Sequence, residues 1–215
     1  MIIITPAPGS AFTYHAGIEW MGSGWEKKMH EDTAPRIAAV AATMMTPEQQ
    51  SAADVVTAGP RGGVRGPFAV LLNSPGAFSA AQGLGAYLRF QSALPANLRE
   101  LAILTTARHW HQDYEWRIHA AIAQEAGVSE RAIESLAAGG SVQGLSPEES
   151  IVHAFCHQLH RTNDVDNATF SAAERLLEPA GVIDLCAVCG YYALLAMVMN
   201  VARNPVPVTP SPFAD

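Results

Sequence analysis

The stretch LRELAILTTARHWHQDYEWRIHAAIAQEAGVSERAIESL, residues 98–136, decides the fold. Together with the proline just before it, it predicts one helix over residues 95–110, because proline suits the first turn of a helix. Helical character continues over residues 114–127 and stops at a glycine, the usual residue after a helix end. Ser129 then begins a third, short helix. Three helices therefore follow one another with no strand between them.

Helical patterns also account for most of the remaining chain. The other helices that we predict begin after Thr46 and cover residues 76–92, 146–160, 167–177 and 181–203. Few runs alternate with period two, and none is bounded like a pair of strands. The sequence therefore predicts an all-α protein.

The chain divides into three predicted segments. Residues 1–46 form an irregular N-terminal extension, residues 47–203 a helical domain, and residues 204–215 a proline-rich C-terminal arm. A glycine-rich loop at residues 59–68 lacks the Gly-Lys-Ser/Thr ending of a P-loop, so we do not assign it to phosphate binding.

The composition limits the partners and the compartment. Hydrophobic residues make up 49% of the chain and charged residues 15%, which predicts a large core, a subunit interface, or both. The net charge of -7 argues against a nucleic-acid or anionic-membrane partner. We find no signal peptide and no uninterrupted membrane span, and there are only three cysteines. We therefore expect a cytoplasmic homo-oligomer.

The segment HWHQDYEWRIH, residues 109–119, holds the candidate chemistry. Glu115 and His119 are four residues apart, so a helix places them on one face, and a carboxylate beside an imidazole can relay protons. His111 precedes Glu115 by one turn, while Trp110, Tyr114 and Trp116 can supply apolar walls. The alternative is a solvated ion pair beside core tryptophans.

Residues 98–136 resemble the core of the carboxymuconolactone decarboxylase family, which includes the alkylhydroperoxidase AhpD-like proteins. The stretches RGGVRGPFAVLLNSP, residues 61–75, and GYYALLAMVMN, residues 190–200, resemble it too. The combination of RELAIL, EWRIH and AGVS carries the resemblance. It implies an AhpD-like bundle of about seven or eight helices and a homo-oligomer, a trimer or a hexamer.

The redox branch of this family carries Cys-x-x-Cys-x-x-x-His, and the two cysteine positions are Gln112 and Glu115 here. The chain therefore resembles the decarboxylase branch, whose motif is Glu-Trp-Arg-x-His. The resemblance implies a catalytic relay of Glu100, Glu115 and His119. In this relay we expect His119 to be the general acid, Glu115 to set its tautomer, and Glu100 to act from one layer further out.

The implied reaction is a lyase reaction without a cofactor, on a small unsaturated lactone or carboxylate. The conjugated lactone is itself the electron sink, so the protein must hold the anion and return a proton to carbon. Guanidinium groups bind carboxylates in bidentate fashion, which makes Arg61, Arg65 and Arg108 candidate anion holders. His111, Tyr114 and Trp116 complete the predicted substrate-binding set.

Two other clusters suggest competing functions. Cys186 and Cys189 form a Cys-x-x-Cys, which would suit an AhpD-like redox protein, although buried cysteines in an apolar helix are usually inert. His153 and His157 have the spacing of helical zinc ligands, in a stripe that also contains Cys156 and His160, but we expect no metal. A third possibility is a non-catalytic protein that binds a small molecule on the same fold.

Overall fold

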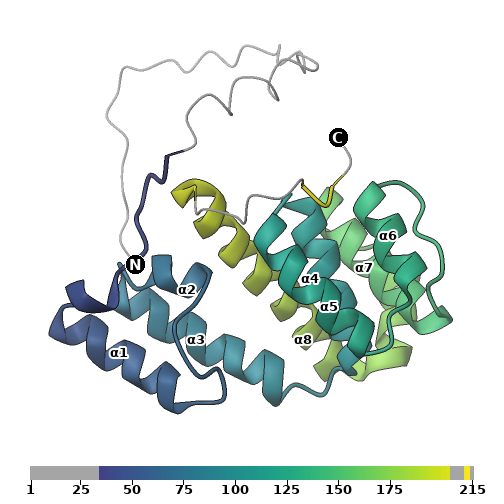
Figure 1. The fold of residues 1–215 in the computed structure, drawn as a ribbon. Helices are drawn as coiled ribbons and strands as arrows, with labels where there is room; N and C mark the ends of the chain where they lie inside the picture. Colours follow the sequence, from purple (N-terminus) through teal and green to yellow (C-terminus); the bar gives the residue numbers. More distant parts are fainter. Residues whose placement is uncertain (1–33, 204–210, 214–215) are drawn as a thin grey trace, which may run out of the picture. The chain divides into compact units, whose positions relative to one another are not determined.

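The computed structural model describes residues 34–203 and 211–213, and within them the chain is all-α, as predicted. A short 3-10 helix, η1 (Ala42–Met44), precedes eight α-helices (Figure 1). These are α1 (Pro47–Ala58), α2 (Pro67–Leu71), α3 (Pro75–Phe90), α4 (Ala96–His109), α5 (Asp113–Glu125), α6 (Glu130–Ala138), α7 (Pro147–Thr162) and α8 (Asn167–Ala202). No strand occurs in this part of the chain.

The helix starts follow the sequence signals. Thr46 and Ser146 each form a capping box, in which the cap side chain and the third helical residue satisfy each other's backbone N–H groups. Helix α8 is broken at Glu178, whose φ of 58° is left-handed, immediately before Pro179. The break accounts for the two separate helices expected over residues 167–203.

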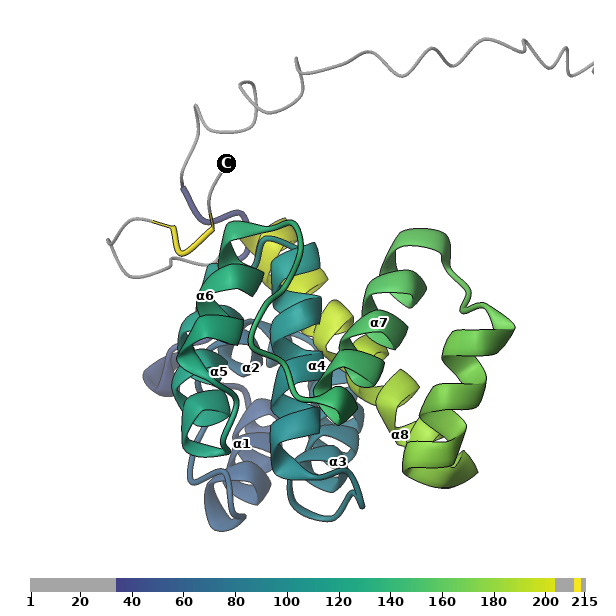
Figure 2. The ribbon, with the colours of Figure 1, turned by 90° about the vertical axis from the view of Figure 1, so that its right-hand side faces the viewer.

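Helix α4 is the central element of the described fold. Figure 2 shows α5 and α6 on one side of it and α7 on the other, with α8 crossing behind. Nine of its residues are buried, among them Leu101, Ile103 and Leu104. Leu101 and Leu104 belong to a core cluster with α5 and α6, whereas Ile103 belongs to the larger cluster with α1, α2, α3, α7 and α8. A functional group on α4 therefore lies at the junction of two cores.

Helix α8 is the longest and most apolar element. By length and composition it could cross a membrane, but 61% of its apolar window is buried within the fold, as in the core helix of a globular domain. Its outer side carries Ile183, Leu194, Met197 and Val201, which are all exposed. These four residues form an apolar stripe with no partner among the described residues.

The predicted flanking segments are described only in part. Within the N-terminal extension, residues 34–46 are irregular apart from η1, and Arg36 N–H donates to the Ala202 carbonyl at the end of α8. Residues 1–33 lie outside the described residues. Of the predicted arm only residues 211–213 are described, and Phe213 is buried against Trp116.

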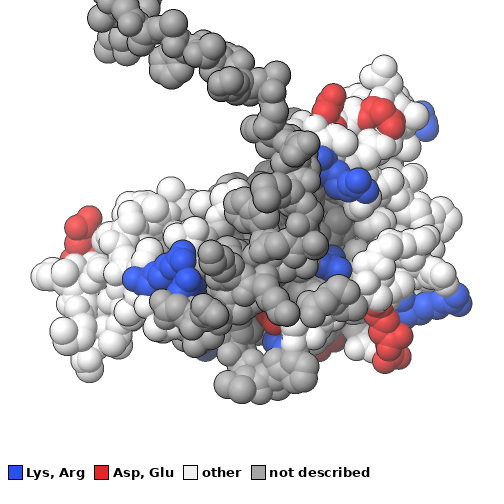
Figure 3. All heavy atoms as spheres, turned by 90° about the horizontal axis from the view of Figure 1, so that it is seen from above, with Lys and Arg blue, Asp and Glu red and all other residues white. Residues whose placement is uncertain are grey.

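Charged side chains are sparse on the described surface. On the face seen in Figure 3, the arginine, aspartate and glutamate side chains form small separate groups among uncharged atoms. This agrees with a charged fraction of only 15%.

Candidate active site

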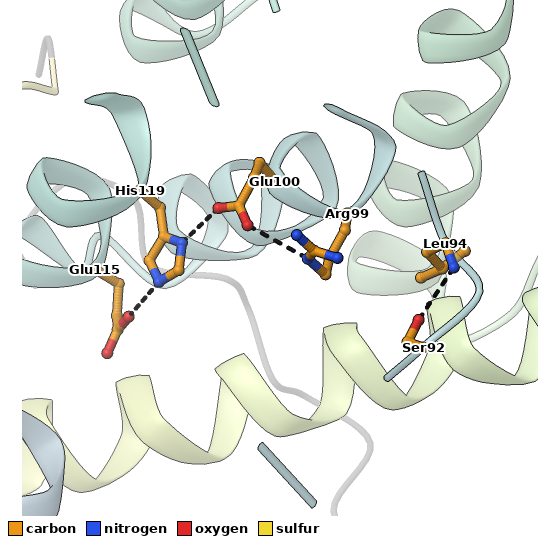
Figure 4. A network of polar contacts seen from close by, with 6 residues as sticks. All are labelled: Ser92, Leu94, Arg99, Glu100, Glu115 and His119. Carbon is orange, nitrogen blue, oxygen red and sulfur yellow. Dashed lines mark hydrogen bonds and ion pairs between the residues drawn. The ribbon is translucent and has the colours of Figure 1, made fainter. Parts of the chain in front are cut away.

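Three buried ionisable side chains form a carboxylate–imidazole–carboxylate relay (Figure 4). Glu100 comes from α4, and Glu115 and His119 come from α5. Nδ1 of His119 lies 2.6 Å from Oε2 of Glu100, and Nε2 lies 3.5 Å from Oε2 of Glu115. The exposed fractions of Glu100, Glu115 and His119 are 1%, 4% and 3%. The imidazole therefore has a carboxylate near each nitrogen and almost no contact with bulk water.

Glu100 contacts the imidazole directly, from the neighbouring helix α4. A carboxylate oxygen accepts, so Nδ1 of His119 must carry the proton in this 2.6 Å bond. The second oxygen of Glu100, Oε1, lies 3.4 Å from Nε of Arg99. Glu100, rather than Glu115, therefore sets the tautomer of His119 and leaves Nε2 facing Glu115.

The turn between α4 and α5 places the two helices so that their side chains meet. The Gln112 side chain accepts a hydrogen bond from Tyr114 N–H and thereby caps α5. Its amide nitrogen donates to Oδ1 of Asn200 on α8 over 2.6 Å, and Nδ2 of Asn200 donates to the Trp110 carbonyl over 3.0 Å. Gln112 is thus a structural residue that fixes the start of α5.

The relay opens into a cavity of about 320 Å³. Glu115 and His119 line it, together with side chains from the 60–68 loop, α3 and α8. The polar residues of the lining besides the relay are Arg61, Arg65, Arg89, Tyr114, Tyr191 and Tyr192. The apolar walls include Phe68, Phe90, Ile118 and Leu195. Three guanidinium groups and two relay residues therefore face one space.

Burial changes the protonation of Glu115. It raises the pKa of this carboxyl group, while the positive charges of His119, Arg61 and Arg89 oppose the shift. A raised pKa keeps a larger share of Glu115 in the neutral, proton-donating form near neutral pH. Since Glu115 lines the cavity, it can donate a proton there as well as accept one from His119.

Two tyrosines of α8 provide phenol groups beside the relay. Burial raises the pKa of Tyr191 to about 12, although Arg61 opposes the shift, and burial also raises the pKa of Tyr192. The Tyr192 ring contacts the His119 ring edge to face at 5.0 Å. Space for the Tyr191 hydroxyl exists because residue 85 is glycine, and a Cβ there would overlap it. Both phenols therefore remain protonated donors at neutral pH.

The predicted substrate-binding residues divide between two places. Arg61, Arg65 and Tyr114 line the relay cavity, as the predicted role requires. Arg108 and His111 line a different cleft, because Arg108 follows Glu100 by two helical turns, roughly 12 Å along the axis. Their assignment to the His119 site was wrong.

Trp116 also lies outside the cavity. Each helical residue is rotated by about 100° from the previous one, so Trp116 faces away from the side that Glu115 presents. Its ring packs against Phe213 with the centroids 5.2 Å apart, in the core cluster of α4, α5 and α6. Trp116 is therefore a core residue, and its predicted contact with substrate was wrong.

Sequence reasoning missed Arg89, Tyr191 and Tyr192. The two tyrosines belong to the stretch that resembles the family, which was the available signal. Arg89 lies near the end of α3, where a single basic residue is common on any helix. Nothing in its local sequence separates it from a surface arginine.

The cysteines are arranged differently from the predicted pair. Sγ of Cys189 lies 3.5 Å from Sγ of Cys156, within reach of a weak thiol hydrogen bond, and both thiols are buried. Cys186 is only half-buried, and none of the three cysteines lines the His119 cavity. The hydrogen bond from Cys156 and the nearby His160 lower the pKa of Cys189 to about 6, against the effect of burial.

The histidine stripe of α7 lies at the same cleft as Arg108. His153 and His157 are neighbours, with ring centroids 5.7 Å apart. In the described part of the chain, no group of three or more histidine, cysteine or carboxylate side chains is placed to hold a metal ion.

Solved structures share this fold at low sequence identity. The debrominase Bmp8 in complex with 2,3,4-tribromopyrrole has a TM-score of 0.64 at 12% identity, covering 83% of this chain and 94% of that one. An uncharacterized peroxidase-related protein from Silicibacter has a TM-score of 0.63 at 15% identity, covering 80% and 93%. An alkylhydroperoxidase AhpD core protein from Ralstonia eutropha has a TM-score of 0.62 at 16% identity, covering 77% and 88%. No curated protein matches the chain.

Fold and site together define the class: an AhpD-like all-α protein with a buried relay at a cavity. Residues 75–155 match the model of the carboxymuconolactone decarboxylase family. This match covers Glu100, Glu115 and His119. In this part the chain is similar to the carboxymuconolactone decarboxylase family, and the likeness to the solved structures shows the fold.

Proposed function

We propose that this protein is a cofactor-free lyase that acts on a small unsaturated lactone or carboxylate. The observation that carries the proposal is the cavity in which Glu115 and His119 face Arg61, Arg65 and Arg89. Proton donors and anion holders line one space, which is what decarboxylation of an activated lactone requires. The family match supports an enzyme but does not define the substrate.

The arginines hold the substrate in this proposal. Guanidinium groups bind carboxylates through paired hydrogen bonds, and Nε of Arg61 has no hydrogen-bond partner within the described residues although it is buried. Arg61 also stacks its guanidinium over the Phe68 ring at 4.3 Å, which fixes its plane. A carboxylate or lactone oxygen in the cavity would satisfy the unpaired N–H.

Glu115 and His119 handle the proton. The bond between the γ-carbon and its carboxylate breaks, CO2 leaves, and the electron pair passes through the double bond to the lactone carbonyl oxygen. Nearby phenol and guanidinium donors stabilise that oxygen. Glu115, kept partly neutral by burial, then returns a proton to carbon and is reprotonated from water by way of His119. Glu100 is a positioning residue, because its bond to Nδ1 holds Nε2 of His119 toward Glu115.

The proposal is tested with unsaturated γ-lactones that carry a carboxylate on the γ-carbon. We expect CO2 release, together with deuterium at carbon when the reaction runs in D2O, followed by NMR. His119→Gln and Glu115→Gln should each lower kcat by about 10²–10⁴-fold, the usual scale of acid–base catalysis. Glu125→Gln, at an exposed position on the same helix, is the matched control and should leave kcat unchanged. Saturable binding of these lactones without CO2 release or exchange would instead support the non-catalytic binding function.

A redox function for Cys186 and Cys189 ranks behind this proposal. It rests on their spacing, whereas the sulfur contact of Cys189 is with Cys156. The lyase proposal predicts that Cys186→Ser, alone and with Cys189→Ser, leaves CO2 release nearly intact. Loss of turnover in a folded double variant would favour the redox function.

A homo-oligomer and a cytoplasmic location also remain proposals. The stripe of Ile183, Leu194, Met197 and Val201 on α8 is exposed, and it is the apolar face that a second copy of the chain would cover. The position of Gly190 within this stripe has open space around its Cα, which allows another helix to approach. The odd, small number of cysteines favours a reducing compartment.

A further inference from the structure

A second cleft, of about 210 Å³, lies between the end of α4, the segment after α6, and α7. None of its lining residues belongs to the relay cavity. The positively charged or protonatable residues that line it are Arg108, His109, His111, His153, His157, His160 and Arg161. The rest of the lining consists of Thr105, Leu136, Gly139, Gly140 and Val142.

This lining contains five imidazoles and two guanidiniums but no carboxylate. That balance is unusual in a chain with a net charge of -7, where carboxylates outnumber lysine and arginine by 20 to 13. Within the described residues Arg161 forms no ion pair, and Arg161 is exposed at the rim of the cleft. Arg161 and the imidazoles therefore meet no carboxylate from the lining of this cleft.

Two threonines of α4 fix the imidazoles of α7. The Thr105 hydroxyl donates to the Leu101 carbonyl, so its oxygen accepts from Nδ1–H of His153 at 3.3 Å. The Thr106 hydroxyl donates to the Ala102 carbonyl, so its oxygen accepts from Nε2–H of His160 at 2.9 Å. Each neutral imidazole then keeps its other nitrogen for a new proton.

The cationic forms of these histidines disfavour one another. The rings of His109 and His160 are stacked, with centroids 4.8 Å apart and planes at 15°. Burial and the charges of His160, His111 and His157 lower the pKa of His109. Burial, and then the charge of His157, lower the pKa of His153 to about 4. A negative charge in the cleft would relieve this repulsion and stabilise the protonated rings.

We propose that this cleft is a second binding site, for a compact oxyanion such as inorganic phosphate or the phosphate group of a small phosphomonoester. Guanidinium and imidazolium groups both donate N–H bonds to phosphate oxygens, and there is open space around Gly140, whereas the Arg108 guanidinium packs against Gly139. The site is distinct from the relay cavity and does not depend on the proposed lyase function.

Binding at this site should strengthen as the pH falls. The groups that face the cleft are Arg108 and His109 from α4, His111 from the turn, and His153, His157, His160 and Arg161 from α7. From behind, α8 contributes Cys189, whose pKa is lowered to about 6. Lower pH favours the protonated forms of His109 and His153, whose pKa values are lowered, and neutralises this thiolate. Both changes make the potential in the cleft more positive.

The test is a titration of the full chain with sodium phosphate at constant ionic strength, followed by calorimetry and by histidine ring NMR. At about pH 6 we expect saturable binding at or below about 10 mM, with the shifts concentrated in His109 and His160 rather than His119. Acetate and chloride arms separate a preference for phosphate from general attraction of anions.

Variants at exposed positions locate the binding site without removing core residues. Arg161→Gln combined with His157→Gln should weaken phosphate binding about tenfold, with unchanged circular dichroism. Arg175→Gln, at an exposed position of α8 that lines neither cavity, is the matched control and should have no effect. Arg65→Gln tests whether phosphate binds in the relay cavity instead. The proposal is overturned by absence of saturable binding, by equal binding of chloride, or by loss of binding only in Arg65→Gln.

Discussion

Removing the Glu100 carboxylate tests the relay without a substrate. Glu100 is 1% exposed, and its 2.6 Å bond to His119 satisfies an imidazole N–H that is itself buried. Glu100→Ala leaves that N–H without a partner and should cost about 3–5 kcal/mol, the usual effect of removing one member of a buried charged pair. Glu100→Gln keeps the shape and one accepting oxygen but loses the charge, and should cost about 1–2 kcal/mol.

Urea unfolding followed by circular dichroism measures these changes in the free energy of unfolding. A domain of ordinary stability, about 5–15 kcal/mol, survives the glutamine change even where the alanine change prevents folding. Glu134→Gln, at an exposed position of α6, is the control and should shift the midpoint by less than about 0.5 kcal/mol. Nitrogen NMR of His119 should also show less of the Nδ1–H tautomer in Glu100→Gln. An unchanged midpoint together with an unchanged tautomer would refute the assignment of Glu100 as the residue that orients His119.

Three further predictions concern the cavity and the surface. Burial raises the pKa of Glu115, so the stability that the protonated carboxyl group contributes is present at low pH and is lost as the pH rises through its folded pKa. Glu115→Gln should therefore gain stability relative to the wild type between about pH 5 and pH 8. A difference in the free energy of unfolding in urea that stays constant with pH would contradict this. Gly85→Ala should destabilise the fold by about 1–3 kcal/mol, because the new Cβ would overlap the Tyr191 hydroxyl. The control Gly83→Ala on the same helix has open space and should stabilise the fold by about 0.5–1 kcal/mol. Equal shifts of the melting temperature in the two variants would count against a close approach of Tyr191 to position 85. Light scattering should give the mass of at least a dimer, and we expect a trimer or a hexamer. Leu194→Lys combined with Met197→Lys should reduce this mass, whereas the control Glu174→Lys should leave it unchanged. A monodisperse wild-type monomer would disprove the interface on α8.

The helices could be predicted because the residues that determine each helix end are close together in the sequence. The capping residues Thr46 and Ser146 satisfy backbone groups only a few residues away, so no tertiary information was needed. Gly127, with a φ of 102°, ends the α5 segment for the same kind of local reason. The all-α class followed from such signals together with the helical periodicity.

The composition of the site depended on tertiary packing. The spacing of Glu115 and His119 predicted one helix face, and α5 places both at the cavity. The direct bond from Glu100 required the relative positions of α4 and α5, which sequence spacing does not contain. Arg89 and Arg108 are both basic residues near helix ends, but only Arg89 lines the cavity. Helix packing, rather than residue type, separates the two.

The departures from the redox pattern of the family have a structural explanation. Gln112, at the first of the two cysteine positions of that pattern, points to the turn, where it caps α5 and bonds Asn200. Glu115, at the second position, faces the cavity beside His119. The position that would carry a thiol next to the histidine thus carries a carboxyl group whose pKa is raised by burial. Where the redox pattern has a thiol, this chain has a carboxyl group, which can transfer a proton but cannot form a disulfide, and Glu100 bonds the imidazole at its other nitrogen.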